Sequence, residues 1–215
     1  KLLRSDELNL LTDADLAYLA SIPVTGLADF RSAEERKRLP DRIPASVKHV
    51  YDLTIDPGNL MAMMGTPGAE NFRFDEAMLK VYRLLVSQPE YVDVYRAFFV
   101  HVQQPADRPL LFHCSAGKDR TGLAAAFILL ALGVDEATVM ADYLASNDYL
   151  ADKYASELAA HPEMSTVFYV RSGLLRTALD TIRTQYGSVE AFLTGPLGID
   201  VPRLRQSLLY SSQED

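Results

Sequence analysis

One short segment constrains this chain more than any other. Residues 110–113 are apolar up to a final histidine and predict a buried strand, and residues 121–134 form an uncharged run typical of a buried helix. The polar residues between them must form a turn. In such a strand–turn–helix unit, backbone amides and the positive end of the helix point at one spot. The segment therefore predicts an anion-binding site within an α/β fold.

The side chains of this turn match the needs of a phosphate ester. Cys114 begins the turn, where the positive field should hold its sulfur as a thiolate. Arg120 offers a guanidinium fork that fits two phosphate oxygens, and Gly117 allows a tight curl of the backbone. A nucleophile and a phosphate clamp in one loop suit in-line attack on phosphorus. Because fixed N–H groups and Arg120 would neutralise the charge, we expect neither a metal ion nor another cofactor.

Composition narrows the class of protein further. A single cysteine in 215 residues excludes an internal disulfide and a cysteine-rich zinc site. The formal charge of −8 disfavours a broad nucleic-acid-binding surface, although it allows a local basic pocket. The run 121–134 is shorter than the roughly 20 residues of a spanning helix, so we expect a soluble protein without an integral membrane segment. The chain starts at Lys1, as a trimmed chain would, so cytoplasmic and secreted locations both stay open.

Strands and helices alternate in the first half of the chain, and helices fill the rest. The expected strands cover residues 24–30, 47–55 and 110–113, and residues 2–4 could add another. Residues 59–71 are rich in Met and Gly and are expected to form a loop. This order predicts a central, mostly parallel sheet flanked by helices, in a single domain over residues 1–215. The helical insertion after Gly133 either covers the loop as a lid or, as we favour, packs into the core.

The segment HCSAGKDRTG, residues 113–122, resembles the signature of the cysteine-dependent protein tyrosine phosphatase superfamily. Its form is similar to the bacterial and fungal tyrosine/serine branch, some of whose members also act on phosphoinositides. The residues RSDEL at 4–8, DFRS at 29–32 and YGS at 186–188 also resemble that branch. The resemblance implies a sheet with flanking helices, a phosphocysteine intermediate, no cofactor, and a phosphorylated protein or phosphoinositide as substrate.

The resemblance also implies a role for each residue of the loop. Cys114 would be the nucleophile, and Thr121 would hydrogen-bond the sulfur and help it leave in the second step. His113, at the strand end, would be either a supporting hydrogen-bonding residue, neutral or orienting, or a proton shuttle, and the residues leave both roles open. Lys118 would either recognise a highly anionic head group or only raise the local potential. The phosphate would be bound by Ser115, Ala116, Gly117, Lys118, Asp119 and Arg120.

The source of the proton for the leaving group is less constrained. The chain has no tryptophan and so lacks the usual Trp-Pro-Asp acid loop. Asp119 lies in the phosphate loop and is the candidate that the resemblance favours. Asp29 should end a strand at the same sheet edge, where it could position Arg120 or share the acid role. Asp56 follows the next strand, where simpler dual-specificity phosphatases carry their acid.

These observations predict a phosphatase that hydrolyses phosphotyrosine, with phosphoserine and phosphothreonine as further substrates. One alternative is a phosphoinositide phosphatase, which Lys118 suggests. The other is a catalytically weak module that binds phosphorylated partners. The presence of both Cys114 and Arg120 argues against that module, because inactive relatives usually lose one of the two.

Overall fold

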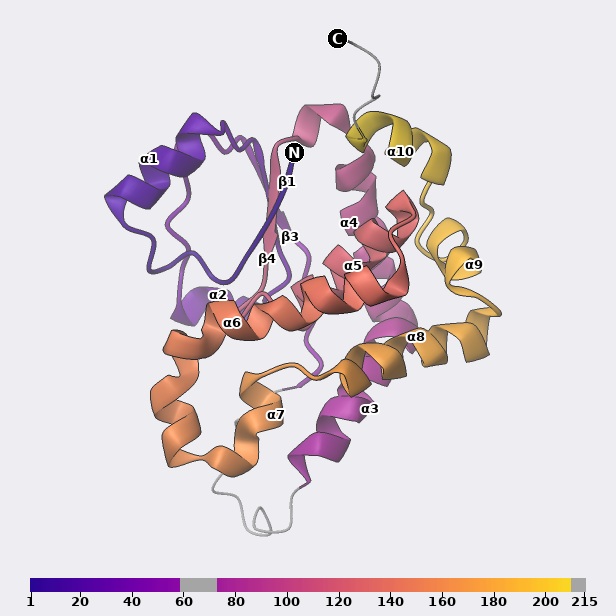
Figure 1. Cartoon of the computed structure of the whole chain (residues 1–215). Coiled ribbons are helices and arrows are strands. Elements are labelled where there is room, and N and C mark those ends of the chain that lie inside the picture. Colours follow the sequence, from indigo (N-terminus) through magenta and orange to yellow (C-terminus); the bar gives the residue numbers. More distant parts are fainter. Residues whose placement is uncertain (59–72, 210–215) are drawn as a thin grey trace.

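The core of the computed structural model is a four-stranded sheet (Figure 1), and the structure describes residues 1–58 and 73–209. The strands are β1 (Leu2–Ser5), β2 (Gly26–Asp29), β3 (His49–Asp52) and β4 (Leu110–His113). They lie in the order β1-β4-β2-β3, and every neighbouring pair is parallel. The expected parallel sheet is thereby confirmed, and the carboxyl ends of all these strands meet at one edge.

Helices connect the strands and make up the second half of the chain. They are α1 (Asp13–Ser21), α2 (Ala33–Arg38), α3 (Phe74–Ser87), α4 (Pro89–Gln103), α5 (Arg120–Leu132), α6 (Glu136–Ala160), α7 (Ser165–Phe168), α8 (Ser172–Tyr186), α9 (Val189–Thr194) and α10 (Val201–Leu208). Short 3-10 turns cover Pro105–Asp107 and Pro162–Met164. Within the described ranges, no helix is both long and apolar enough to cross a membrane.

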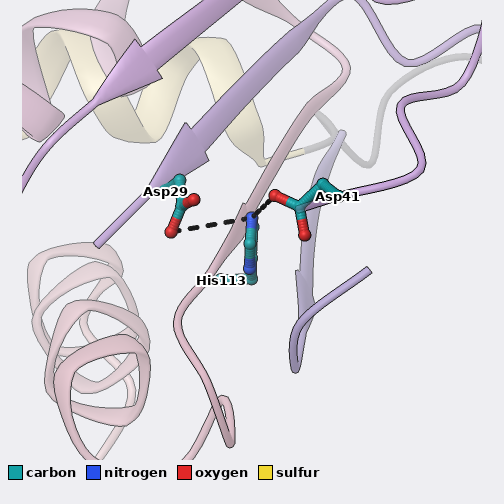
Figure 2. Close-up of side chains that lie close together, drawn as sticks. All are labelled: Asp29, Asp41 and His113. Carbon is teal, nitrogen blue, oxygen red and sulfur yellow. Dashed lines mark ion pairs between the residues drawn. The ribbon is translucent and has the colours of Figure 1, made fainter. Parts of the chain in front are cut away.

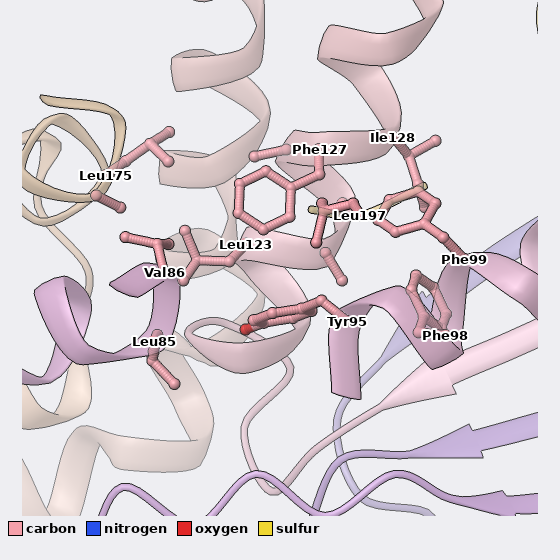
Figure 3. Packing of buried hydrophobic residues seen from close by; sticks show 14 of the residues in the cluster. Leu85, Val86, Tyr95, Phe98, Phe99, Leu123, Phe127, Ile128, Leu175 and Leu197 are labelled. Atoms are coloured by element: carbon pink, nitrogen blue, oxygen red, sulfur yellow. The ribbon is translucent and has the colours of Figure 1, made fainter. Parts of the chain in front are cut away.

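The two faces of the sheet carry cores of different size. Alternation along β4 sends Leu110 and Phe112 into the larger core and Leu111 into the smaller one. The smaller core lies under α1, whereas α3, α4, α5 and α8 build the larger one. Aromatic rings fill the larger core (Figure 3), where Tyr95 and Phe127 meet edge to face with centroids 5.5 Å apart. Burial on both faces explains why the central strands are apolar up to their last residues, Asp29 in β2 and His113 in β4.

Local sequence signals account for the ends of several elements. Thr12 and Ser32 cap α1 and α2 through complete capping boxes, in which Asp15 and Glu35 bond back to the cap. Gly133 ends α5 with a left-handed φ of 91°. The expected strands at 24–30 and 47–55 are present but shorter, as β2 and β3. The expected loop at 59–71 lies outside the described residues.

Candidate active site

The loop between β4 and α5 lies at the carboxyl edge of the sheet. Cys114 follows β4 directly and is only 2% exposed. Asp119 occupies the N-cap position of α5 but does not cap it through its side chain, and the positive end of the helix can attract an anion there. Gly117 has a φ of 66°, and a Cβ there would lie 2.4 Å from the Ser5 carbonyl oxygen. Only glycine fits this contact between the loop and the end of β1.

Arg120 is held in place by the carboxylate of Glu35, a residue of α2. Its Nη1 and Nη2 donate to Glu35 Oε2 and Oε1 at 2.8 and 2.9 Å, as a bidentate pair. Nη1 also donates to the Ile55 carbonyl at 3.0 Å, and Nη2 to the Ser115 hydroxyl at 3.3 Å. These contacts fix the plane of the guanidinium before any phosphate binds.

Glu35 is strongly biased toward its charged form. Burial would raise the pKa of Glu35, but the hydrogen bonds and charge of Arg120, with the Ser115 hydroxyl, outweigh burial and lower it to about 2. The capping box with Ser32 was visible in the sequence. No spacing pattern connects Glu35 with an arginine 85 positions away, so its second role needed the structure.

Asp29 was a candidate for positioning Arg120, but its carboxylate binds Arg31 instead. Its Oδ2 accepts a hydrogen bond from Arg31 Nη2 at 2.9 Å, and its Oδ1 accepts one from the Arg31 backbone at 2.8 Å. Both residues are 1% exposed. The carboxylate that binds Arg120 is therefore Glu35 rather than Asp29.

A buried cluster joins Asp29 to the residue before the cysteine (Figure 2). His113 Nε2 lies 3.2 Å from Asp41 Oδ2 and 3.9 Å from Asp29 Oδ1. Two carboxylates and an imidazole could in principle hold a metal ion. However, Arg31 Nη2 donates to both carboxylates, at 2.9 Å to Asp29 and 2.6 Å to Asp41. The guanidinium already supplies the positive charge there, so these residues form an ion-pair cluster that fits a metal poorly.

Lys118 and Asp119 belong to a second network, which continues into the helices. Lys118 is 2% exposed and donates to Asp119 Oδ2, so it is not a freely solvated lysine. Tyr82 of α3 donates to Asp119 Oδ1 at 2.7 Å, and its hydroxyl lies 2.5 Å from that of Tyr143 in α6. Burial, and then the charge of Asp119, raises the pKa of Tyr82 well above its usual range. Tyr82 therefore remains a hydrogen-bond donor to Asp119.

Two further predicted residues border the loop. The Thr121 hydroxyl is buried and has no hydrogen-bond partner among the residues that the structure describes. Asp56 is exposed, and its Oδ1 accepts from the Gly58 amide at 3.1 Å. It directly follows Ile55, whose carbonyl contacts Arg120. Both Asp56 and Asp119 thus lie near the phosphate clamp, whereas the carboxylate of Asp29 is committed to Arg31.

Helix α6 closes one side of the loop. Lys153 donates to Asp6 Oδ2 at 2.8 Å and to the Ser115 carbonyl at 3.4 Å. Tyr154 packs against Phe168 of α7 with ring centroids 5.2 Å apart. Burial raises the pKa of Tyr154 to about 12, against the opposing charge of Lys153. The helical insertion therefore reaches the rim of the loop. Its aromatic residues differ in burial, because Tyr143 is buried in the core and Tyr149 is 88% exposed.

A family model and two relatives of known name match most of this chain. A family model described as "Tyrosine phosphatase family" matches residues 1–210. The triple specificity protein phosphatase PtpB of Mycobacterium tuberculosis is 32% identical over 255 residues, an alignment that covers 97% of this chain and 91% of that protein. A tyrosine-protein phosphatase of Nostoc commune is 29% identical over 221 residues, which cover 94% of this chain and 71% of that protein.

Proposed function

Because this chain belongs to the tyrosine phosphatase family, we propose that Cys114 carries out phosphate monoester hydrolysis through a phosphocysteine intermediate. The observation that carries the proposal is the bidentate pair between Arg120 and Glu35 beside the uncapped start of α5. The pair supports the proposal because it holds the guanidinium rigid next to the loop that would bind the phosphate. Nothing in this arrangement requires a group other than side chains, backbone amides and water.

The reaction divides into two steps. In the first, the Cys114 thiolate attacks phosphorus, the bond to the ester oxygen breaks, and that oxygen takes a proton from a carboxylic acid. In the second, water attacks the phosphocysteine, its proton passes to the carboxylate, and the sulfur leaves as a thiolate. Arg120 and the loop amides hold the three non-bridging oxygens in both steps, and the Thr121 hydroxyl stabilises the departing sulfur.

The decisive experiment replaces the nucleophile. We expect Cys114→Ser to abolish hydrolysis of an aryl phosphate while vanadate or phosphate still binds, because the clamp is intact. In the wild-type enzyme vanadate should inhibit and chelators should have no effect. A serine variant with full activity would falsify the proposal.

Asp119 is the proton donor that we propose, because the loop itself places it and Tyr82 fixes its orientation. Asp56 is the second candidate, since it adjoins the carbonyl that contacts Arg120. The donor matters most when the leaving oxygen is a poor leaving group. Asp119→Asn should therefore slow phenyl phosphate more than p-nitrophenyl phosphate, whereas Asp56→Asn should slow both little. The reverse pattern would assign the role to Asp56.

Broad specificity is the substrate class that we propose, with phosphotyrosine first and phosphoserine and phosphothreonine as further substrates. One relative is named a triple specificity phosphatase. The contact of Lys118 with Asp119 supports a role inside the loop rather than at a lipid head group. We therefore expect Lys118→Met to lower activity on phosphopeptides and phosphoinositides in the same proportion. A loss of activity confined to phosphoinositides would instead favour a phosphoinositide phosphatase.

A further inference from the structure

We propose that Asp41 is a positioning residue that keeps His113 doubly protonated beside Cys114, an inference that rests on the proposed role of that cysteine. Asp41 lies after α2, far from the loop in sequence, and no motif pointed to it. Its side chain is 7% exposed and reaches the end of β4. The proposal differs from both roles expected of His113, a neutral or orienting residue and a proton shuttle.

The atoms around the imidazole ring require a proton on both nitrogens. Nδ1 of His113 lies 3.2 Å from the Cys114 carbonyl oxygen, which can only accept, so Nδ1 carries a proton. Nε2 lies 3.2 Å from Asp41 Oδ2, and the described residues offer it no aligned hydrogen-bond partner. An unprotonated Nε2 would leave its lone pair beside the negative charge of a carboxylate, and the described residues offer it no hydrogen-bond donor. A protonated Nε2 turns the same contact into an ion pair.

The charge of the buried cluster leads to the same conclusion. Asp29 and Asp41 carry two negative charges, and Arg31 supplies one positive charge. The remaining negative charge would be unpaired in a site that excludes water, which is strongly unfavourable. A charged His113 completes the balance.

Asp41 itself is held as a carboxylate. Burial would raise its pKa, but His113, the Leu8 amide and Arg31 outweigh burial and keep the pKa below its usual range. The Leu8 amide donates to Asp41 Oδ1 at 2.9 Å. Glu7 also acts on Arg31, but its negative charge has its own partner in Lys153, whose Nζ lies 3.3 Å from Glu7 Oε1. The charged groups around His113 are thus Asp29 from β2, Arg31 and Asp41 from the segments after β2 and α2, Glu7 from the segment after β1, and Cys114.

The consequence concerns the nucleophile. A fixed positive charge in the adjoining residue favours the thiolate of Cys114 over the thiol. Asp41 touches neither the substrate nor the sulfur, so it acts only through His113. Without its carboxylate, His113 can lose a proton, and less of Cys114 should be ionised at a given pH.

The protonation state can be read in the unmodified enzyme. Nitrogen-15 NMR of histidine-labelled protein distinguishes a doubly protonated ring from either neutral tautomer. We expect His113 to show two protonated nitrogens from pH 6 to 8, and its signal can be assigned by replacing His49, His101 and His161. A ring with one unprotonated nitrogen over this range would overturn the proposal.

A substitution tests the link to the nucleophile. Asp41→Asn should lower the rate of Cys114 alkylation by iodoacetamide at pH 6 about fivefold or more and move the midpoint of the rate–pH curve upward. The matched control is Asp107→Asn. Asp107 Oδ2 lies 2.9 Å from His101 Nδ1, so this variant also disrupts an aspartate–histidine pair, but one near the opposite end of β4. This control should leave the curve unchanged.

The outcomes separate the two proposals. If Asp41→Asn folds and alkylates like the wild type, Asp41 is not a positioning residue, although the Cys114→Ser result still stands. If Asp41→Asn does not fold, His113→Gln replaces it, because glutamine can donate to the Cys114 carbonyl without carrying a charge. An unchanged alkylation curve in that variant would equally refute the inference.

Discussion

Arg120 shows how a single residue depends on partners that are distant in sequence. The guanidinium would be mobile if phosphate were its only partner, and its bond to Glu35 removes that freedom beforehand. The same carboxylate accepts the Ser32 amide at 2.7 Å, so the cap of α2 and the phosphate clamp share one side chain. Loss of Glu35 should therefore affect both catalysis and folding.

Glu35→Gln should reduce kcat/KM for an aryl phosphate about tenfold or more, because Arg120 loses its charged support. The wild-type pKa of about 2 lies below the ordinary value of 4.5. The stabilisation from the Glu35 carboxylate is therefore complete above about pH 4.5 and disappears as the pH falls through 2. Urea unfolding should accordingly show a difference between wild type and variant at pH 7 that narrows toward pH 3. A difference independent of pH would contradict this assignment.

Between elements, the loop is connected to the helical half of the molecule through hydroxyl groups. Tyr82 from α3 and Tyr143 from α6 join Asp119 in one hydrogen-bonded chain. Arg4 from β1 adds a second connection, because its Nε donates to the Gly117 carbonyl at 2.9 Å and its Nη2 to Ser146 of α6 at 2.6 Å. The first part of α6 is thus fixed to both sides of the loop.

Tyr82→Phe removes the hydroxyl that orients Asp119, with little change in shape. If Asp119 is the proton donor, kcat for phenyl phosphate should fall about tenfold, while p-nitrophenyl phosphate, whose leaving oxygen needs less help, should be affected less. Tyr143→Phe is the matched control, since it retains the bond between Tyr82 and Asp119. Steady-state kinetics on both esters provide the comparison, and an equal loss on the two would rule out a role in proton transfer.

For the whole molecule, prediction from sequence succeeded where the signals were local. A short apolar run located β4, and the uncharged run that follows the loop located α5. Glu35 and Asp41 could not be assigned in this way. Each meets its partner only after β2, β4 and the segments that follow β2 have been brought to one sheet edge. Asp29 was likewise placed at the correct edge, but the sequence did not indicate that its carboxylate would bind Arg31.

The order of the strands bears on how the chain is made. β4 lies between β1 and β2 in the sheet, but residues 1–109 are synthesised before it. Until β4 emerges from the ribosome, β1 has no neighbour in the sheet, and β2 can pair only with β3. The nucleophile therefore arrives with the strand that completes the sheet. Catalytic competence and closure of the sheet should coincide during synthesis.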